Sequence, residues 1–344
     1  MDRYHEPPVM PRAFLWRRLQ SFMGLFLVIF LIEHLLTNSQ ASLLIGDDGI
    51  GFINAVNGIH NLPYLPVIEI TLLGVPFFIH IVWGIKYLMT SKQNAYGNDP
   101  THPTLGKYAK NHAYTWQRIT SWILVFFVIG HVVQMRFMNY PTSAKKGTET
   151  FYMIPVSLDD GIYTVSERLG VSLVSKNQIK EERKKLDSPQ LKAGPPTESI
   201  TGFFSRITEA FTSSSDDGLQ KKEVQELLAE QELRQQKDWV KALTAWTLNP
   251  GEVIAIAPDF GTAELMLVRD TFKSPLMLFL YSIFVLAATY HAFNGLWTFN
   301  ITWGITLTAR SQSYMRIFSV FLMFVIGFLG LVAIWGSYLV NLNH

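Results

Sequence analysis

The chain has 344 residues, of which 49% are hydrophobic and 16% charged, and it contains no cysteine. Soluble proteins carry about 25% charged residues, so this composition is unusual for one. The lack of cysteine excludes disulfides, thiolate zinc sites, iron–sulfur clusters ligated by this chain and covalently attached c-type haem. The net charge of +2 gives no indication of nucleic-acid binding.

Five long apolar segments dominate the sequence, at about residues 19–36, 65–90, 114–134, 274–299 and 317–340. Each has about 18 residues or more, enough to cross a hydrocarbon core about 30 Å thick. We therefore predict an all-α integral membrane protein, a bundle of five transmembrane helices in the lipid bilayer. Residues 1–140 would hold an N-terminal segment and helices one to three, and residues 273–344 helices four and five.

Charge is concentrated between helices three and four, in residues 141–272, which hold 16 of the 29 Lys and Arg and 20 of the 27 Asp and Glu. We predict that this segment is an extramembrane α+β insert. Residues 180–213 have the composition of a flexible linker. Residues 219–246 are amphipathic and predict a helix, whereas EVIAIAPDFGTAELMLVRD, at 252–270, predicts two short strands around a turn.

The short connections predict the orientation of the chain. Lys and Arg occur in the N-terminal stretch, in the second-to-third connection and in the fourth-to-fifth connection, but not in residues 38–62 or in the C-terminal NLNH. The positive-inside rule then places the N-terminus in the cytoplasm and the C-terminus outside, with the insert on the outer side. The expected location is the inner, or cytoplasmic, membrane.

Four of the nine histidines lie inside the predicted helices, where ionisable residues are functional candidates. We counted depth at about 1.5 Å per residue from the end where each helix enters the membrane. His34 and His131, here named the first pair, lie near the outer face. His80 and His291, the second pair, lie near the cytoplasmic face. The four histidines thus form two pairs, one in each leaflet, on four different helices.

Two neutral imidazoles that face each other across a helix bundle provide the axial ligands of a b-type haem. The two pairs therefore predict two bis-His b haems, with these four histidines as the metal ligands. Gly84, Gly130 and Gly295 lie near the ligands and leave room for a porphyrin, although close helix packing also explains them. Each histidine taken singly is equally explained as a hydrogen-bonded core residue. A proton relay is the alternative for the set, but it gives no reason for two depth-matched pairs.

The histidine segments are FLWRRLQSFMGLFLVIFLIEHL, VPFFIHIVWGIKY, TWQRITSWILVFFVIGHVVQMR and HAFNGLWTFNITWGITLTARSQ. They resemble the five-helix, single-anchor form of the dihaem cytochrome b subunit of succinate dehydrogenase and fumarate reductase. The resemblance implies that the four histidines are the axial ligands, in the same pairs. It also implies a flavoprotein subunit and an iron–sulfur subunit docked on the cytoplasmic face, and a menaquinone-type site near the membrane.

The resemblance has two departures from the family pattern. Residues 141–272 are not covered, because the family usually has a short third connection. An acid that some fumarate-reducing members carry two residues before the last haem ligand is replaced here by Thr289. A proton pathway through that acid is therefore not expected in this chain.

The expected role is that of the anchor and quinone-reactive subunit of a succinate:quinone oxidoreductase. This chain would pass electrons between the iron–sulfur subunit, the two haems and a membrane quinone, while the dicarboxylate chemistry takes place on another subunit. One alternative is the haem b subunit of a hydrogenase or formate dehydrogenase. The other is a haem-free, proton-coupled transporter.

Further ionisable residues are weaker candidates. Arg118, an intramembrane arginine, is a candidate partner for the anionic haem propionates, as is Arg136. Because quinone reduction takes up protons, a quinone site requires titratable groups near a haem edge, and Glu33 and His60 are the candidates. The alternatives are a helix-packing role for Glu33 and a position in a solvated loop for His60. Glu69 has two possible roles, one facing the outer haem pocket and one extending to the membrane surface.

Overall fold

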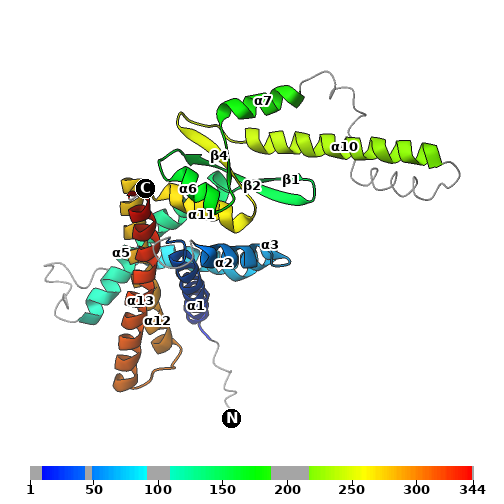
Figure 1. Ribbon diagram of the computed structural model, residues 1–344. Helices are drawn as coiled ribbons and strands as arrows, with labels where there is room; N and C mark the ends of the chain where they lie inside the picture. The colour runs from blue at the N-terminus through cyan, green and yellow to red at the C-terminus, as the bar shows by residue number, and fades with distance from the viewer. Residues whose placement is uncertain (1–9, 43–48, 91–108, 187–216, 343–344) are drawn as a thin grey trace, which may run out of the picture. The chain divides into compact units, whose positions relative to one another are not determined.

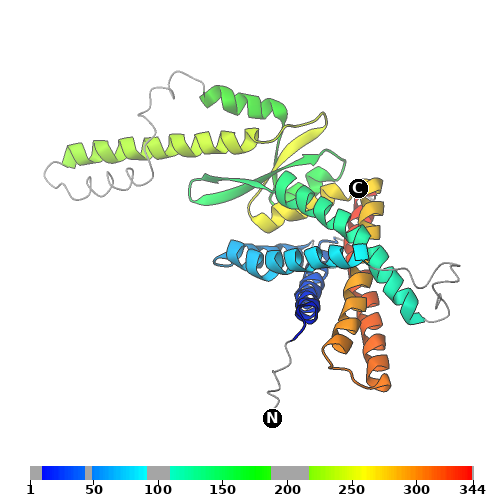
Figure 2. The same ribbon diagram turned by 180° about the vertical axis from the view of Figure 1, so that it is seen from behind.

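The computed structural model describes residues 10–42, 49–90, 109–186 and 217–342 (Figure 1, and from behind in Figure 2). The chain divides into two compact units, one formed by Met1–Met138 with Thr271–Asn343 and the other by Asn139–Asp270. We call these the helical unit and the insert unit, and describe each by itself.

The helical unit contains five helical spans that are long and apolar enough to cross a membrane, as predicted. Large apolar side chains remain exposed along them, among them Phe78 (70%), Phe126 (69%) and Phe324 (67%). Such extensive apolar exposure is a hallmark of lipid-facing surface. The spans are α1 (Arg12–Ser39), α3 (Leu65–Glu69) with η1 (Ile70–Gly74) and α4 (Val75–Thr90), α5 (Ala109–Val132) with η2 (Val133–Met138), α12 (Pro275–Thr302) and α13 (Ala309–Leu342).

Aromatic contacts fix the directions of three of these helices. Trp16 in the second turn of α1 stacks on Trp83 of α4, with ring centroids 4.1 Å apart. The guanidinium of Arg18 lies 5.2 Å from the ring centroid of Trp303, directly after α12. The start of α1 therefore lies beside the second half of α4 and the end of α12. Further along α1, Gly24 lies against the earlier residue His80 of α4, and Leu35 meets Gly330 of α13 together with Val285 in the first half of α12, so α1 runs antiparallel to both.

Helix α13 packs against α1 and α12 and carries no histidine. Small residues permit the close approach: a Cβ at Gly330 would lie 2.8 Å from a methyl group of Val285, and one at Gly327 would lie 3.4 Å from the hydroxyl of Thr289. Thr289 is 2% exposed and donates a hydrogen bond to the carbonyl of Val285. Thr289 is therefore a buried packing residue against α13.

The insert unit is built on a four-stranded antiparallel sheet in the order β1-β2-β4-β3. Met153 and Ile154 of β2 and Ile254 of β4 are fully buried and lie in its core. The strands are β1 (Thr142–Lys146), β2 (Glu149–Ser157), β3 (Ser172–Val174) and β4 (Glu252–Ala257). The helices are α6 (Ile162–Arg168), α7 (Lys176–Leu186), α10 (Asp217–Thr244) and α11 (Phe260–Thr271).

The amphipathic helix predicted at 219–246 is confirmed as α10. The prediction of two strands within 252–270 is wrong in its second half, because β4 is followed by helix α11. The Asp259 carboxylate accepts hydrogen bonds from the backbone N–H and the hydroxyl of Thr262. Asp259 is therefore the N-cap residue that starts the helix.

Helices also occupy two segments that were expected to be loops. α7 covers the first residues of the predicted linker 180–213, and the linker from 187 onward lies outside the described residues. α2 (Ile50–His60) lies within the first connection. Part of the basic second-to-third connection, 91–108, also lies outside them.

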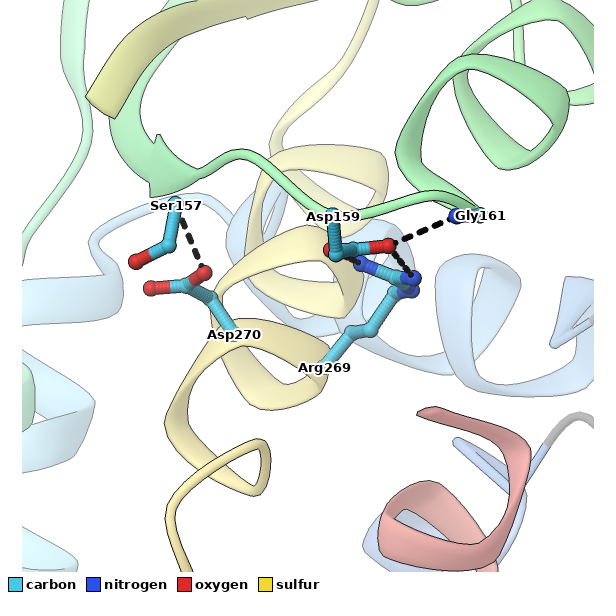
Figure 3. Close-up of polar contacts among 5 residues, drawn as sticks. All are labelled: Ser157, Asp159, Gly161, Arg269 and Asp270. Atoms are coloured by element: carbon cyan, nitrogen blue, oxygen red, sulfur yellow. Dashed lines mark hydrogen bonds and ion pairs between the residues drawn. The ribbon is translucent and has the colours of Figure 1, made fainter. Parts of the chain in front are cut away.

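A buried ion pair joins the end of β2 to α11 (Figure 3). Arg269 is 4% exposed and donates two hydrogen bonds to the Asp159 carboxylate, at 2.8 and 2.7 Å. Asp159 also accepts from the backbone N–H of Gly161, and Asp270 accepts from the backbone N–H of Ser157. Two successive residues of α11 thus hold both sides of the turn between β2 and α6.

Candidate functional site

The structure brings the four helix histidines together as two pairs. His34 of α1 faces His131 of α5, with ring centroids 5.9 Å apart and ring planes at 74°. His80 of α4 faces His291 of α12, with centroids 6.1 Å apart and planes at 87°. These are the same two pairs that the depth count predicts, and the four side chains are all half-buried.

The spacing within each pair fits a metal between the rings. A metal ion bound by imidazole nitrogens at about 2 Å on either side leaves the two ring centroids about 6 Å apart. Within the described residues no group of three or more His, Asp or Glu is arranged to hold a metal ion. The described His, Asp and Glu side chains therefore offer two ligands at each pair, and a porphyrin supplies four further nitrogens.

Polar groups around the second pair set which ring nitrogen is available. The Nδ1 atom of His80 lies 3.1 Å from the carbonyl oxygen of Gln20, and a carbonyl can only accept. The Nδ1 atom of His291 lies 3.2 Å from the side-chain amide nitrogen of Gln117, which can only donate, and 3.3 Å from the hydroxyl of Ser121. Because Nδ1 of each ring is engaged in these contacts, Nε2 is the nitrogen left to bind a metal.

The first pair has different partners. The Nδ1 atom of His131 lies 3.2 Å from the hydroxyl of Tyr281 on α12, and this hydroxyl donates to the side-chain oxygen of Gln134. The Nδ1 atom of His34 lies 3.5 Å from the amide nitrogen of Asn38, one turn further along α1. The contact between His131 and the Tyr281 phenol on a neighbouring helix is thus shorter than the contact between His34 and Asn38.

Gly24 is a close-approach site that sequence reasoning missed. A Cβ at Gly24 would lie 3.0 Å from Cε1 and 3.2 Å from Nδ1 of His80, so a side chain there would press on the imidazole. The glycines singled out from the sequence are less crowded. The nearest atoms lie at 3.6 Å for Gly84 and 3.8 Å for Gly295, and Gly130 has nothing within 4 Å, which leaves open space beside His131.

Two further predicted site residues, Arg118 and Glu33, make contacts within their own helices. The guanidinium of Arg118 lies 5.0 Å from the ring centroid of Tyr114 on its own helix. Glu33 is exposed on α1 and accepts a hydrogen bond from the hydroxyl of Thr37 at 3.0 Å. Neither contact involves a residue of the two pairs.

His60, Glu69 and Arg136 form a charged group at one end of the helical unit. Glu69 and Arg136 make an ion pair at 2.8 Å, and both carry charge that acts on His60. Burial lowers the pKa of His60 below its usual value, Arg136 lowers it further, and Glu69 partly opposes these effects. Of the two quinone-site candidates, His60 is the one with charged neighbours from other segments.

Tyr281 and Gln134 are also absent from the sequence-based candidates. A signal for Tyr281 exists, because it precedes His291 by ten residues on α12, about 15 Å along a helix axis. The same depth arithmetic that pairs the histidines places this phenol at the level of the first pair. Gln134 follows His131 by three residues and gives no comparable signal.

Comparison with known proteins gives one distant relative. Over 327 residues the chain is 22% identical to the succinate dehydrogenase cytochrome b558 subunit of Bacillus subtilis (strain 168), and the match covers 94% of this chain and 96% of that protein. No protein-family model matches the chain, and no solved structure matches it. The chain is thus similar, over most of its length, to a cytochrome b subunit.

Proposed function

We propose that this chain is the membrane anchor and dihaem cytochrome b subunit of a succinate:quinone oxidoreductase. The observation that carries the proposal is the arrangement of four histidines from four helices in two pairs, with ring centroids 5.9 and 6.1 Å apart. The distant similarity to the succinate dehydrogenase cytochrome b558 subunit supports the type of enzyme complex.

Each bound haem would supply a one-electron redox centre. The chain's own residues hold the ligand rings: the Nδ1 contacts of His80, His131 and His291 fix the orientation of these rings and leave Nε2 as the ligand atom. The apolar helices around the pairs exclude water. Arg118 is proposed as a partner for a haem propionate.

The proposed partners, an iron–sulfur subunit and a flavoprotein subunit on the cytoplasmic face, rest on the similarity to a succinate dehydrogenase subunit. The composition is consistent with them, because a chain without cysteine ligates no iron–sulfur cluster and needs another subunit to carry one. In this proposal the N-terminus is cytoplasmic, the C-terminus and the insert lie outside, and the chain is in the cytoplasmic membrane. Haems held by the two pairs would allow electrons to move between the cytoplasmic side and the outer side, since α12 runs for about 15 Å from His291 of the second pair to Tyr281 at the level of the first pair.

We propose a menaquinone-type site near the first pair, with His60 and Glu33 as its titratable groups. Support comes from the charge around His60, since Arg136 in η2 follows His131 by five residues and is paired with Glu69. Ionisable groups close to a haem edge supply protons to a reduced quinone.

The test is redox spectroscopy of the purified complex. We expect a b-type band in the reduced-minus-oxidised spectrum and two haems per chain in a haem extraction assay. A purified chain with no b-type band would refute the haem proposal and favour the proton-coupled transporter. Co-purification of a covalently flavinylated subunit supports the succinate:quinone complex over a hydrogenase or formate dehydrogenase.

A further inference from the structure

We propose that Tyr281 is the positioning residue of the first pair. Its hydroxyl accepts a hydrogen bond from the Nδ1–H of His131, which fixes the tautomer and orientation of that ring. This inference rests on the proposed function of His131 as a haem ligand.

The direction of the hydrogen bonds follows from the single proton of a phenol. The Tyr281 hydroxyl donates its proton to the side-chain oxygen of Gln134, at 3.2 Å. Its oxygen, 3.2 Å from Nδ1 of His131, therefore faces that nitrogen as an acceptor. Nδ1 of His131 then carries the ring proton, and the lone pair on Nε2 is directed to the metal.

Aromatic packing holds the phenol in place. The Tyr281 ring lies edge-to-face against Phe272, with centroids 5.2 Å apart, and against Phe284 at 6.1 Å. Phe284 also contacts the ring of His131, at 5.6 Å. Such edge-to-face pairs add stabilisation beyond their burial, so the hydroxyl is presented from a ring that its neighbours hold in place.

A change of helix geometry supplies the second partner of the hydroxyl. The α-helical hydrogen bonding of α5 ends at Val132, and the π-helical turn η2 begins at Val133 and includes Gln134. π-helical turns within α-helices occur frequently at functional sites. Here the turn lies directly after His131 and carries the amide that orients the phenol.

Among the four histidines, His131 is the one whose Nδ1 partner is a phenol. His80 is bonded to a backbone carbonyl, which no substitution removes, and His34 to an amide of its own helix. Removing the hydroxyl of Tyr281 therefore acts on the first pair and leaves the second unchanged. The haem at the second pair serves as an internal reference.

The expected effect follows from ligand basicity. A hydrogen-bond acceptor at Nδ1 raises the basicity of the metal-bound imidazole and stabilises the ferric state, and loss of such a partner typically weakens metal binding about 10-fold to 100-fold. In Tyr281→Phe we therefore expect a more positive midpoint potential for the haem at the first pair and weaker retention of that haem. The haem at the second pair should keep its potential and occupancy.

The experiment is a redox titration, followed by visible spectroscopy, of the purified complex containing wild-type chain, Tyr281→Phe, Gln134→Leu or Tyr338→Phe. Tyr338 contacts the ring of Trp335 on α13, so Tyr338→Phe is the matched control and should leave both potentials unchanged. Gln134→Leu keeps the phenol but frees its proton, and we expect a smaller shift of the same haem in the same direction.

Equal potentials in wild type and Tyr281→Phe, with both haems bound, would overturn the inference, as would a shift confined to the haem of the second pair. If Tyr281→Phe does not assemble, Gln134→Leu decides, and an unchanged potential in it overturns the inference. Wild-type complex without b haem would instead refute the proposed function, so the two failures are distinguishable.

Discussion

Replacement of Gly24 by alanine is expected to weaken the haem of the second pair selectively. The added Cβ would lie 3.0 Å from Cε1 and 3.2 Å from Nδ1 of His80. Because carbon contacts are optimal at about 3.5–4.0 Å, the ring must move by about 0.5 Å. That movement strains the 3.1 Å contact to the Gln20 carbonyl and changes the 6.1 Å spacing to His291.

The size of the effect follows from the cost of overpacking. Forcing one extra methyl group into a packed interior costs about 1–3 kcal/mol. If that cost falls on the ligand-bound geometry, haem affinity at the second pair drops about 5-fold to about 150-fold, since about 1.4 kcal/mol corresponds to a factor of ten. Functional geometries of this kind tolerate displacements of only about 0.5 Å.

The assay is haem content and redox titration of the purified Gly24→Ala complex. Gly58→Ala is the matched control, because a Cβ at Gly58 in α2 meets no atom within 4 Å, and the substitution brings the same gain in helix propensity. We expect Gly24→Ala to lose or shift the haem of the second pair, while Gly58→Ala keeps both. Two haems with unchanged potentials in Gly24→Ala would refute the reasoning.

Three other predictions concern the pairs, the insert unit and acid stability. Replacing either histidine of one pair by alanine should remove the haem of that pair, and therefore the same spectral species in both variants. If one substitution in the first pair and one in the second pair remove the same species, the pairing is refuted. In the insert unit, Asp159→Ala removes the carboxylate that accepts two hydrogen bonds from buried Arg269, so we expect a loss of about 3 kcal/mol in the stability of this unit, measured by limited proteolysis, with an unchanged haem spectrum. The pKa of His60 is lowered from 6.5 in the folded chain, so protonation favours unfolding: stability should be full above pH 6.5 and be lost as the pH falls through the folded pKa. Thermal unfolding from about pH 8 to about pH 5 should show a smaller acid loss in His60→Gln, and equal losses would contradict the assignment.

The insert unit shows where local sequence patterns are insufficient. The run around the Pro-Asp-Phe-Gly turn predicts a second strand after Pro258, yet the Asp259 cap starts helix α11 there. Strand β2 pairs with β4, about a hundred residues further along the chain. Sheet partners this distant depend on packing against α10 and α11, which no window of the sequence contains.

The sequence by itself determined the five apolar spans and the grouping of four histidines by depth. Both are one-dimensional quantities, because backbone hydrogen bonding fixes the rise of a helix at about 1.5 Å per residue. Tertiary structure decided what depends on the rotation and lateral contacts of each helix. It placed the Tyr281 hydroxyl at Nδ1 of His131 and the Gln20 carbonyl at Nδ1 of His80. It also placed Gly24, which has no side chain, directly against the His80 ring. Residue spacing gives the height of a side chain in the membrane, and helix packing alone gives its neighbour.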